Sequence, residues 1–385
     1  MKLYIIALVE LGLSNDDILK LVTIVSEKDI KDIFRGMYLD IQFKYNLDLN
    51  KYLKVFQNKE KLATSIIEAK NILNKCKELG IKTVSINSKR YPTTLKKIHN
   101  PPVILYYKGR EISKVHEKSI GCVGTRDITE FGVNAVTKLL PSLVAEGFTI
   151  ISGLAEGVDA YSHKVCLENN GVTIAVLAHG LDYIYPKSNE FLAEQIINNG
   201  GTLVSEYPPG TRADKFRFVH RNRIVSGLAK GLLVFECKEK SGTMHTVNFS
   251  IEQNKPVFCP KPSVITDTTS GPAYLIEKQK AIGIPSTNAY NLIVHTMGYK
   301  LKNKEKLKRI KANNASVMIN NINIYPQQIF SIMSSDDTCT SSVKVDRETY
   351  SLYKEYLAKY HLSNKDVINA VILSLAEQYK KEQNQ

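Results

Sequence analysis

Short apolar runs that alternate with helix-length stretches constrain the fold of this chain more than any other feature. Each run ends in a glycine-rich or polar loop, and the runs cover residues 119–123, 149–151, 172–177, 202–205, 231–235 and 256–259. Such alternation is typical of βαβ units and predicts a parallel sheet of the α/β class. Open sheets of this class bind ligands at the carboxyl ends of their strands. We therefore look for functional residues in the loops that follow these runs.

Three of the loops carry groups that suit anionic oxygens. They contain Gly124, Thr125 and Arg126 after the first run, Ser152, Gly153 and Gly157 after the second, and Ser241, Gly242 and Thr243 after the fifth. Backbone N–H groups at a helix start and a guanidinium both favour phosphate. A single loop of this kind is often only a tight turn, but three at one sheet edge favour a phosphate-bearing ligand. Neither G-x-G-x-x-G nor G-x-x-x-x-G-K-[ST] occurs, which disfavours NAD binding and a P-loop.

The densest basic stretch of the chain lies between residues 215 and 223. Its candidate DNA-binding residues are Lys215, Arg217, Arg221, Asn222 and Arg223, and they are interleaved with Phe216 and Phe218. Arginine forks bind phosphate, and phenylalanine faces stack the bases of single strands. The whole chain has 52 Lys and Arg against 38 Asp and Glu, a net charge of +14, which indicates a polyanionic partner. The alternative is a solvated arginine face with both phenylalanines in the core.

The remaining patterns divide the chain into four parts. Residues 1–80 are predicted to form a helical domain, with Ser14 as the N-cap of a helix to residue 26 and further helices near 29–45, 48–57 and 59–79. The α/β domain is predicted to span residues 81–295, with two strands before residue 119 that add an edge to the sheet. Residues 296–340 are predicted to form a basic and polar linker. Its lysines are either a solvated helix face or an electrostatic contact with nucleic acid.

Residues 341–385 are predicted to form a small strand–helix–helix module. Alternation over residues 341–346 indicates a strand, and two helical stripes follow it. The pattern resembles a ribbon-helix-helix unit, in which two chains pair their strands and insert the ribbon into a DNA groove. Ser342 and Lys344 would then contact duplex DNA. The alternative is a helical hairpin that only dimerises.

No spacing in the chain points to catalysis or to a bound metal. The histidines at 163, 179, 220 and 245 are not part of a recognisable Ser-His-Asp set, carboxylate pair or metal-ligand cluster. We therefore predict neither an enzyme nor a cofactor or metal. The six cysteines include no C-x-x-C pair, and no apolar stretch is long enough to span a bilayer. Both observations favour a cytoplasmic protein with reduced thiols.

The loops also share their motifs with a known family. The matching stretches are Val123-Gly124-Thr125-Arg126, Ser152-Gly153-Leu154-Ala155-Glu156-Gly157-Val158-Asp159, Gly180-Leu181-Asp182 with Tyr185-Pro186 and Asn189, Ser205 to Thr211, Arg221 to Leu228, and Ser241-Gly242-Thr243. In this order they resemble the DNA-processing protein A (DprA/Smf) family. The resemblance covers about residues 70–295, and the helices before it fit the helical domain of that family.

The resemblance implies a Rossmann-like fold that forms a homodimer and binds single-stranded DNA without catalysis. It implies protection of the strand and its transfer to a RecA-type recombinase, in DNA recombination and natural transformation. The basic strand-binding pocket of the family, carried over, falls on Arg126, Lys187, Arg221 and Arg223, with Asn189 beside them. The chain departs from the family at Val219-His220, where a proline is usual. Residues 296–385 also differ from the winged-helix-like end of the family.

Two other functions remain open from the sequence. The first is a sensor of a nucleotide-derived ligand, or a nucleoside-phosphate hydrolase like the lysine-decarboxylase-like (LOG) group. The glutamate of the P-G-G-x-G-T-x-x-E signature of that group has no counterpart in residues 240–246, which disfavours the hydrolase. The second is a regulator that binds duplex DNA through residues 341–385.

Overall fold

The computed structural model describes residues 1–114, 117–285, 289–301, 317–319 and 322–324. The chain divides into two compact units, Met1–Lys300 and Leu301–Gln385. The described residues of the second unit include an antiparallel hairpin of β10 (Val317–Ile319) and β11 (Ile322–Ile324). The module predicted at 341–385, with Ser342 and Lys344, lies outside the described residues, as does most of the linker predicted at 296–340. The boundaries predicted at residues 80 and 295 remain predictions.

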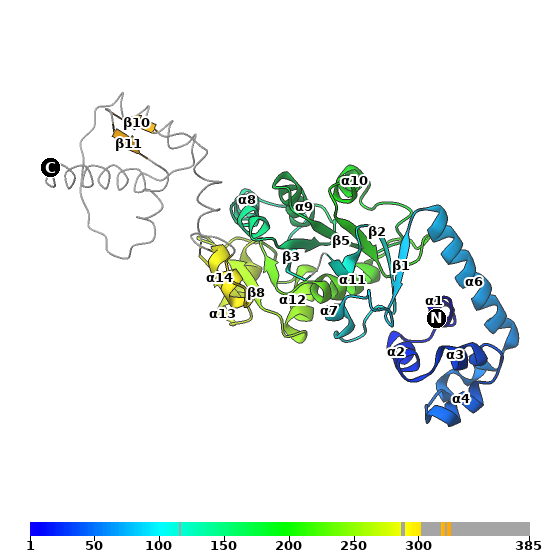
Figure 1. The fold of residues 1–385 in the computed structure, drawn as a ribbon. Helices are drawn as coiled ribbons and strands as arrows, with labels where there is room; N and C mark the ends of the chain where they lie inside the picture. The colour runs from blue at the N-terminus through cyan, green and yellow to red at the C-terminus, as the bar shows by residue number, and fades with distance from the viewer. Residues whose placement is uncertain (115–116, 286–288, 302–316, 320–321, 325–385) are drawn as a thin grey trace. The chain divides into compact units, whose positions relative to one another are not determined.

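A nine-stranded sheet forms the centre of the first unit (Figure 1). Its strands are β1 (Lys82–Ser85), β2 (Ile104–Gly109), β3 (Ser119–Val123), β4 (Thr149–Ser152), β5 (Thr173–Leu177), β6 (Thr202–Ser205), β7 (Leu232–Val234), β8 (Val257–Pro260) and β9 (Ile282–Ile284). They lie in the order β1-β2-β6-β5-β4-β3-β7-β8-β9. The strands from β6 across to β9 pair in parallel, whereas β1 and β2 pair antiparallel with their neighbours. The predicted α/β class and Rossmann-like parallel sheet are confirmed.

The predicted apolar runs correspond to β3 through β8, and residues 81–118 supply the predicted edge, β1 and β2. The interior strands β3, β4, β5, β6 and β7 are buried along their whole length, which is why each contains a continuous apolar stretch rather than an alternating pattern. The sequence did not predict β9, because this edge strand is only partly buried and lacks such a run. The chain runs from β3 to β6 in one direction and resumes at β7 on the other side of β3. In open α/β sheets, ligands bind at such a reversal, which here lies at the carboxyl ends of β3 and β7.

Helices cover both faces of the sheet (Figure 1). One layer contains α8 (Glu130–Ala145), α9 (Val158–Glu168) and α10 (Glu190–Asn198), and the other contains α7 (Thr93–Lys96), α11 (Lys215–Leu228), α12 (Thr243–Glu252) and α13 (Ser270–Glu277). The helix α14 (Ala289–Thr296) packs against α8. Short 3-10 turns occur at Asn50–Tyr52, Ile112–Lys114 and Lys187–Asn189. Each βα connection therefore delivers its loop to the same edge of the sheet.

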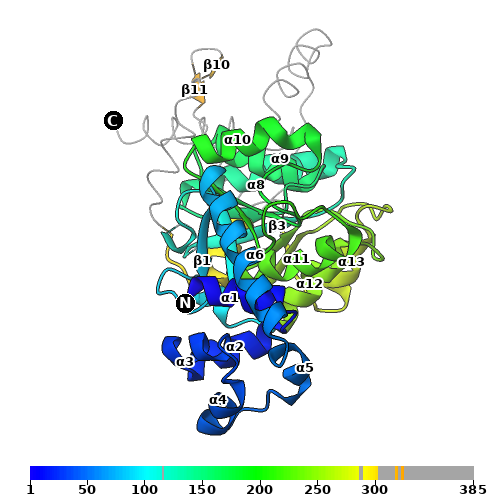
Figure 2. The ribbon, with the colours of Figure 1, turned by 90° about the vertical axis from the view of Figure 1, so that its right-hand side faces the viewer.

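The N-terminal part of this unit is helical, as predicted. Its helices are α1 (Lys2–Glu10), α2 (Asn15–Ile24), α3 (Glu27–Ile33), α4 (Tyr38–Tyr45), α5 (Leu53–Phe56) and α6 (Lys59–Glu78). Ser14 caps α2 as predicted, because its side chain accepts from the backbone N–H of Asp17. The single helix predicted over 29–45 was wrong, since Gly36 has a φ of 91° and breaks it into α3 and α4. The long α6 packs on α1 and lies beside β1 (Figure 2).

The described cysteines behave as small apolar residues. Cys76, Cys122, Cys166, Cys237 and Cys259 are buried and free. Burial raises the pKa of the Cys76 thiol to about 11, which keeps it protonated at neutral pH. Among the described helices, none combines the length and the apolar character that crossing a bilayer requires.

Candidate nucleic-acid interface

The three glycine-rich loops predicted from the sequence meet at the carboxyl edge of the sheet. The backbone N–H of Thr125 donates to the carbonyl of Glu236 at 2.7 Å, which joins the loops after β3 and β7. The N–H of Val158 donates to the carbonyl of Thr125 at 3.0 Å, which adds the loop after β4. Gly157 has a φ of 73°, and a methyl group built on it would lie 2.3 Å from the Arg126 carbonyl oxygen. Only glycine fits there, so this close packing of two loops depends on it.

Protein carboxylates occupy two of the helix starts that the sequence analysis assigned to phosphate. At the start of α8, the Glu236 carboxylate accepts from the backbone N–H of Thr129 at 2.6 Å and from its hydroxyl at 2.7 Å. In the first turn of α9, Asp159 accepts from the N–H of Gly153 at 3.1 Å. Both carboxylates are buried and complement the positive ends of the helix dipoles. These two helix starts are therefore already occupied by groups of the protein.

The start of α12 differs from the other two. It has no acidic residue in its first turn and no side-chain cap, and Gly242 is exposed with no neighbouring heavy atom within 4 Å of a methyl group built on it. The hydroxyl of Thr243 donates to the Gly124 carbonyl at 3.0 Å, so this residue fastens the loop rather than facing solvent. Of the third predicted loop, Gly242 is thus the residue left open.

Arg221 is an internal brace. Its side chain is buried, and its guanidinium donates to the carbonyls of Gly153 at 2.7 Å and of Val176. Burial lowers the pKa of Arg221 to about 10, and the nearby Asp159 carboxylate opposes this shift. A methyl group on Gly153 would lie 2.5 Å from Arg221 Nη2 and 2.6 Å from Asp159 Oδ2. Gly153 is therefore required so that the arginine and the aspartate can close over the ends of β4 and β5.

Arg223 is also committed within the protein. Its guanidinium donates to both oxygens of Glu206, at 2.8 and 2.6 Å, and its Nε donates to the Asn100 carbonyl at 2.9 Å. Both side chains are buried. Burial alone would raise the pKa of Glu206, but hydrogen bonds from His220 and Arg223 and the charge of Arg223 lower it. The structure places Arg221 and Arg223 in the interior, with half-buried Asn222 between them, although the sequence predicted phosphate contacts for all three.

A second group of residues forms what we call the aromatic cluster: the exposed Arg126 and Tyr185 beside the half-buried Phe218. The Arg126 guanidinium lies 5.7 Å from the centre of the Phe218 ring, and the Tyr185 ring lies 5.9 Å from it. Arg126 is exposed, and Tyr185 is 51% exposed. Within the described residues, no carboxylate lies within salt-bridge distance of Arg126. A cation and two ring faces thus share one open surface.

The other predicted residues differ in whether their side chains are exposed or already engaged within the protein. Lys187 and Lys215 are exposed, whereas Arg217 forms an ion pair with Asp214 at 2.9 Å and lies 5.4 Å from the ring of Tyr207. Asn189 is buried and donates to the Leu154 carbonyl at 2.9 Å, which fixes the turn that carries Lys187. Lys187 and Lys215 are therefore available to an anion, and Asn189 positions one of them.

Sequence reasoning missed several members of the site. Arg212 is exposed, and its guanidinium lies 5.4 Å from the Tyr183 ring. Its position just before the basic stretch at 215–223 was the only signal for it. Tyr185 was noted only as part of a motif, although it faces Phe218 across the edge. The role of Glu236 gave no signal, because its partner Thr129 is far away in the sequence.

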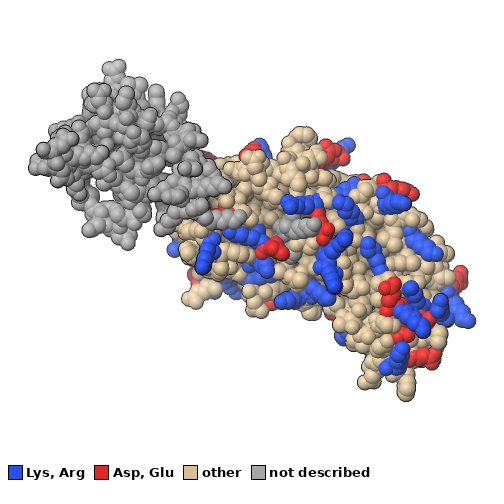
Figure 3. Space-filling view, viewed as in Figure 1, with Lys and Arg blue, Asp and Glu red and all other residues tan. Residues whose placement is uncertain are grey.

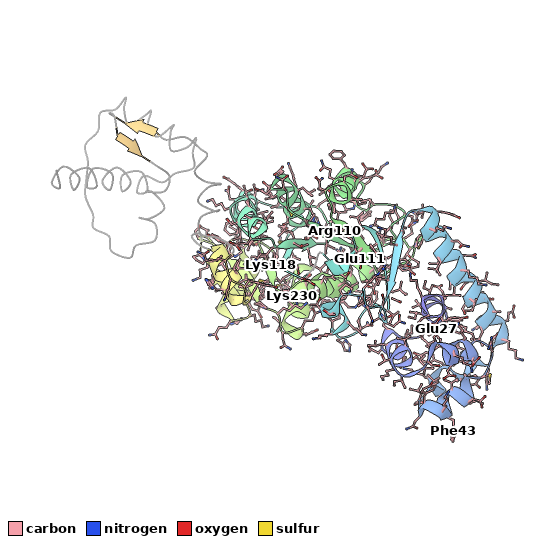
Figure 4. All side chains as sticks on the ribbon, in the orientation of Figure 1. Glu27, Phe43, Arg110, Glu111, Lys118 and Lys230 are labelled. Atoms are coloured by element: carbon pink, nitrogen blue, oxygen red, sulfur yellow. The ribbon has the colours of Figure 1, made fainter. Side chains whose placement is uncertain are left out.

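The opposite edge of the sheet, at the amino ends of the parallel strands, faces the viewer in Figure 4, where Arg110, Lys118 and Lys230 are labelled. Lys118 is engaged within the protein, since its Nζ donates to the Glu146 carbonyl at 2.7 Å and lies 4.7 Å from the centre of the Phe148 ring. Figure 3 shows acidic side chains between the basic ones on this face. Lys118, at this edge, is therefore already held by contacts within the protein.

The histidines of the described chain do not assemble into a catalytic group. His163 is buried against the Thr173 hydroxyl at 2.6 Å, and burial lowers its pKa to about 3. His179 is buried beside Tyr183, and His220 contacts Glu206 at 3.1 Å. Within the residues that the structure describes, no three metal-ligating side chains gather in one place. The arrangement can bind an anion and stack rings, but it presents no assembled acid, base and nucleophile.

Comparison with known proteins decides the family. The model of the family named DNA recombination-mediator protein A matches residues 82–294. The chain belongs to this family. The matched span contains β1 through β9 and the whole carboxyl edge, so the resemblance seen in the motifs is confirmed. Proteins of this family are named DNA processing proteins.

Individual relatives agree with this assignment. The DNA processing protein DprA of Bacillus subtilis is 40% identical over 207 residues, which cover 54% of this chain and 69% of that protein. The X-ray structure of DprA from Streptococcus pneumoniae superposes with a TM-score of 0.61 at 29% identity, and covers 78% of this chain and 99% of that one. The structure of DprA from Helicobacter pylori, which is described for its single-stranded DNA binding mode, superposes with a TM-score of 0.50 at 28% identity. The match covers 56% of this chain and 95% of that one.

Proposed function

We propose that this chain binds single-stranded DNA along the carboxyl edge of its sheet and does not catalyse a reaction. The aromatic cluster is the observation that carries the proposal, because it combines the exposed Arg126 with the rings of Phe218 and Tyr185. A positively charged groove with rings for successive bases is how sequence-tolerant proteins hold single strands. The single-stranded DNA binding named for the Helicobacter pylori relative supports the same assignment.

Within this proposal, the predicted residues divide into two roles. Arg126, Lys187 and Lys215 are exposed and contact phosphates. Arg221 and Arg223 are buried and instead fix the loops that carry those contacts. The glycines at 124, 153 and 157 allow the loops to pack closely, and Gly242 leaves the start of α12 open. Binding then depends on side-chain cations and falls as salt rises.

The wider role follows from the family. We propose that the protein acts in the cytoplasm as a homodimer in DNA recombination, that it protects single strands and that it transfers them to a RecA-type recombinase, in natural transformation where the host takes up DNA. This part is tested by adding the protein to recombinase and strand coated with a single-strand-binding protein. A shorter lag before recombinase ATP hydrolysis supports the transfer, and an unchanged lag with normal DNA binding contradicts it while leaving the DNA site intact.

The DNA site itself is tested by fluorescence anisotropy with one oligonucleotide and its duplex, at about 50 and about 200 mM salt. We expect tighter binding to the single strand. Arg126→Ala should reduce the slope of log affinity against log salt by about 0.7, the value for one phosphate contact on a single strand. Phe218→Ala should weaken binding by about 1–3 kcal/mol without changing that slope, because it removes a stacking ring but no charge.

The matched control is Phe191→Ala, since Phe191 is 70% exposed on α10 and outside the aromatic cluster. It should leave affinity unchanged. The proposed site is wrong if folded Arg126→Ala and Phe218→Ala proteins bind the single strand with the same affinity as wild type. Preference for the duplex would move the function to residues 341–385, and binding of neither DNA would direct attention to nucleotide ligands.

A further inference from the structure

The loop after β6 joins the aromatic cluster to the helical N-terminal part. Its backbone is held on one side by hydrogen bonds, in which the N–H of Gly180 donates to the Thr211 carbonyl at 2.9 Å and the N–H of Ala213 donates to the Tyr183 hydroxyl at 2.6 Å. Arg212, between these two anchored positions, extends over the Tyr183 ring. Hydrogen bonds thus hold this loop in place, and the loop carries the exposed guanidinium of Arg212 beside the Tyr183 ring.

At Gly210, the loop after β6 comes close to α6. Gly210 has a φ of 95°, and its N–H donates to the Asp182 carboxylate at 2.8 Å. A methyl group built on Gly210 would lie 3.6 Å from Lys75 Nζ, with no other heavy atom within 4 Å. Lys75 belongs to the last turn of α6 and is exposed. An ammonium from the helical part therefore stands next to the loop of the sheet edge.

Both cations are available to a ligand. Within the described residues, no carboxylate lies within salt-bridge distance of Lys75 or Arg212. Asp182 also lies at this loop, and one of its oxygens accepts from the N–H of Gly210. Free ammonium and guanidinium groups at the surface bind the phosphates of a polyanion. The series of cations thus continues beyond the aromatic cluster, through Arg212, to Lys75.

We propose that a single strand of sufficient length continues from the aromatic cluster across Arg212 to Lys75, so that the N-terminal helical part forms one end of the DNA path. The inference rests on the proposed function, because it extends the same site. It assigns to α6 a direct phosphate contact in addition to its packing on α1. The consequence is that affinity depends on strand length, and that the last gain in affinity requires Lys75.

The test measures anisotropy of the full-length protein with thymidine oligonucleotides from about 6 to about 30 nucleotides, a range that spans known single-strand site sizes. Lys75→Glu should bind the short strands like wild type and lose affinity for the long ones. For long strands, Lys75→Gln should lower the salt slope by about 0.7, equivalent to roughly a 2.5-fold smaller loss of affinity between about 50 and about 200 mM salt. Arg212→Gln should act in the same direction.

The matched control is Lys61→Glu, which makes the same charge change on an exposed residue in the first turn of α6. The two lysines are about 21 Å apart along the helix. If the affinity of Lys75→Glu equals that of Lys61→Glu at every strand length, the extended path is wrong. The results for Arg126→Ala and Phe218→Ala still decide the proposed site. If wild type binds no single strand of any length, both proposals are overturned.

Discussion

At the scale of single residues, two neighbouring arginines show why charge alone does not identify a DNA contact. Arg221 and Arg223 lie in the densest basic stretch of the chain, yet both are buried. The Glu206 carboxylate accepts two hydrogen bonds from Arg223, so the charge of the arginine is neutralised within the protein. A buried pair of this kind is sensitive to loss of one member, because the other is left as an unpaired buried charge.

Arg223→Ala should therefore act on stability rather than on DNA. We expect the free energy of unfolding, from urea titration, to fall by about 3–5 kcal/mol. Arg217→Ala is the matched control, because it removes a partly exposed ion pair with Asp214, worth about 0–1 kcal/mol. A stable Arg223→Ala protein with weakened DNA binding and a lower salt slope would show instead that Arg223 contacts phosphate.

The sequence predicted that these residues gather at the carboxyl edge of the sheet, but it could not separate the exposed residues from the buried ones. The position of Arg126 after a buried strand predicts an exposed residue at the carboxyl edge, and the structure places it there. The pairing of Arg223 with Glu206 depends on how β6 and α11 are arranged in space, and the sequence does not encode that distance. The same holds for Glu236, which occupies the start of α8 from a strand far away in the chain.

At the scale of elements, two N-terminal helices begin with the same arrangement, in which an aspartate accepts hydrogen bonds from a serine, a lysine and a tyrosine. At the start of α2, Asp17 accepts from the Ser14 hydroxyl, from the Tyr52 hydroxyl at 2.6 Å and from Lys51 at 2.6 Å. Burial alone would raise the pKa of Asp17, but these hydrogen bonds lower it to about 2. The contact fastens the start of α2 to residues 51–52, far along the chain.

The start of α3 has the same arrangement, made by other residues. Asp29 accepts from Ser26 at 2.9 Å, from Lys44 at 2.8 Å and from the Tyr45 hydroxyl. Hydrogen bonds from Lys44 and Tyr45 are the main reason why the pKa of Asp29 is lowered to about 2. The serine caps are visible in the sequence as Ser-x-x-Asp, but the Lys-Tyr partners are not, because they belong to segments that only tertiary packing brings near.

These two aspartates predict acid sensitivity of the helical part. A carboxyl whose folded pKa lies below its unfolded value stabilises the fold above the unfolded value, and this stability is lost as pH falls through the folded pKa. The window here runs from about pH 4 down to about pH 2. The melting temperature should therefore drop steeply in this window, and Asp17→Asn with Asp29→Asn should lower it at neutral pH and flatten the drop. Asp16→Asn, an exposed neighbour, should leave the profile unchanged.

At the scale of the whole molecule, the pattern of apolar runs was sufficient to predict the sheet. Parallel strands covered on both faces are continuously apolar, so β3 to β8 were visible in the sequence. The edge strand β9 and the break at Gly36 were not, since each is decided by partial exposure or by a single backbone conformation. The described residues of the proposed DNA path, from Arg126 to Lys75, all belong to the unit Met1–Lys300.

A chain shortened to residues 1–300 should therefore retain the preference for single strands. Its affinity should stay within about threefold of the full chain, because no contact of the path is removed and the main cationic segment lost is the basic run at 302–311. Any affinity for duplex DNA should fall further, since the predicted module at 341–385 is also absent. Anisotropy with matched single-stranded and duplex probes measures both changes, with circular dichroism and melting temperature as checks of folding. A folded 1–300 chain that no longer binds the single strand would assign the DNA contact to residues 301–385.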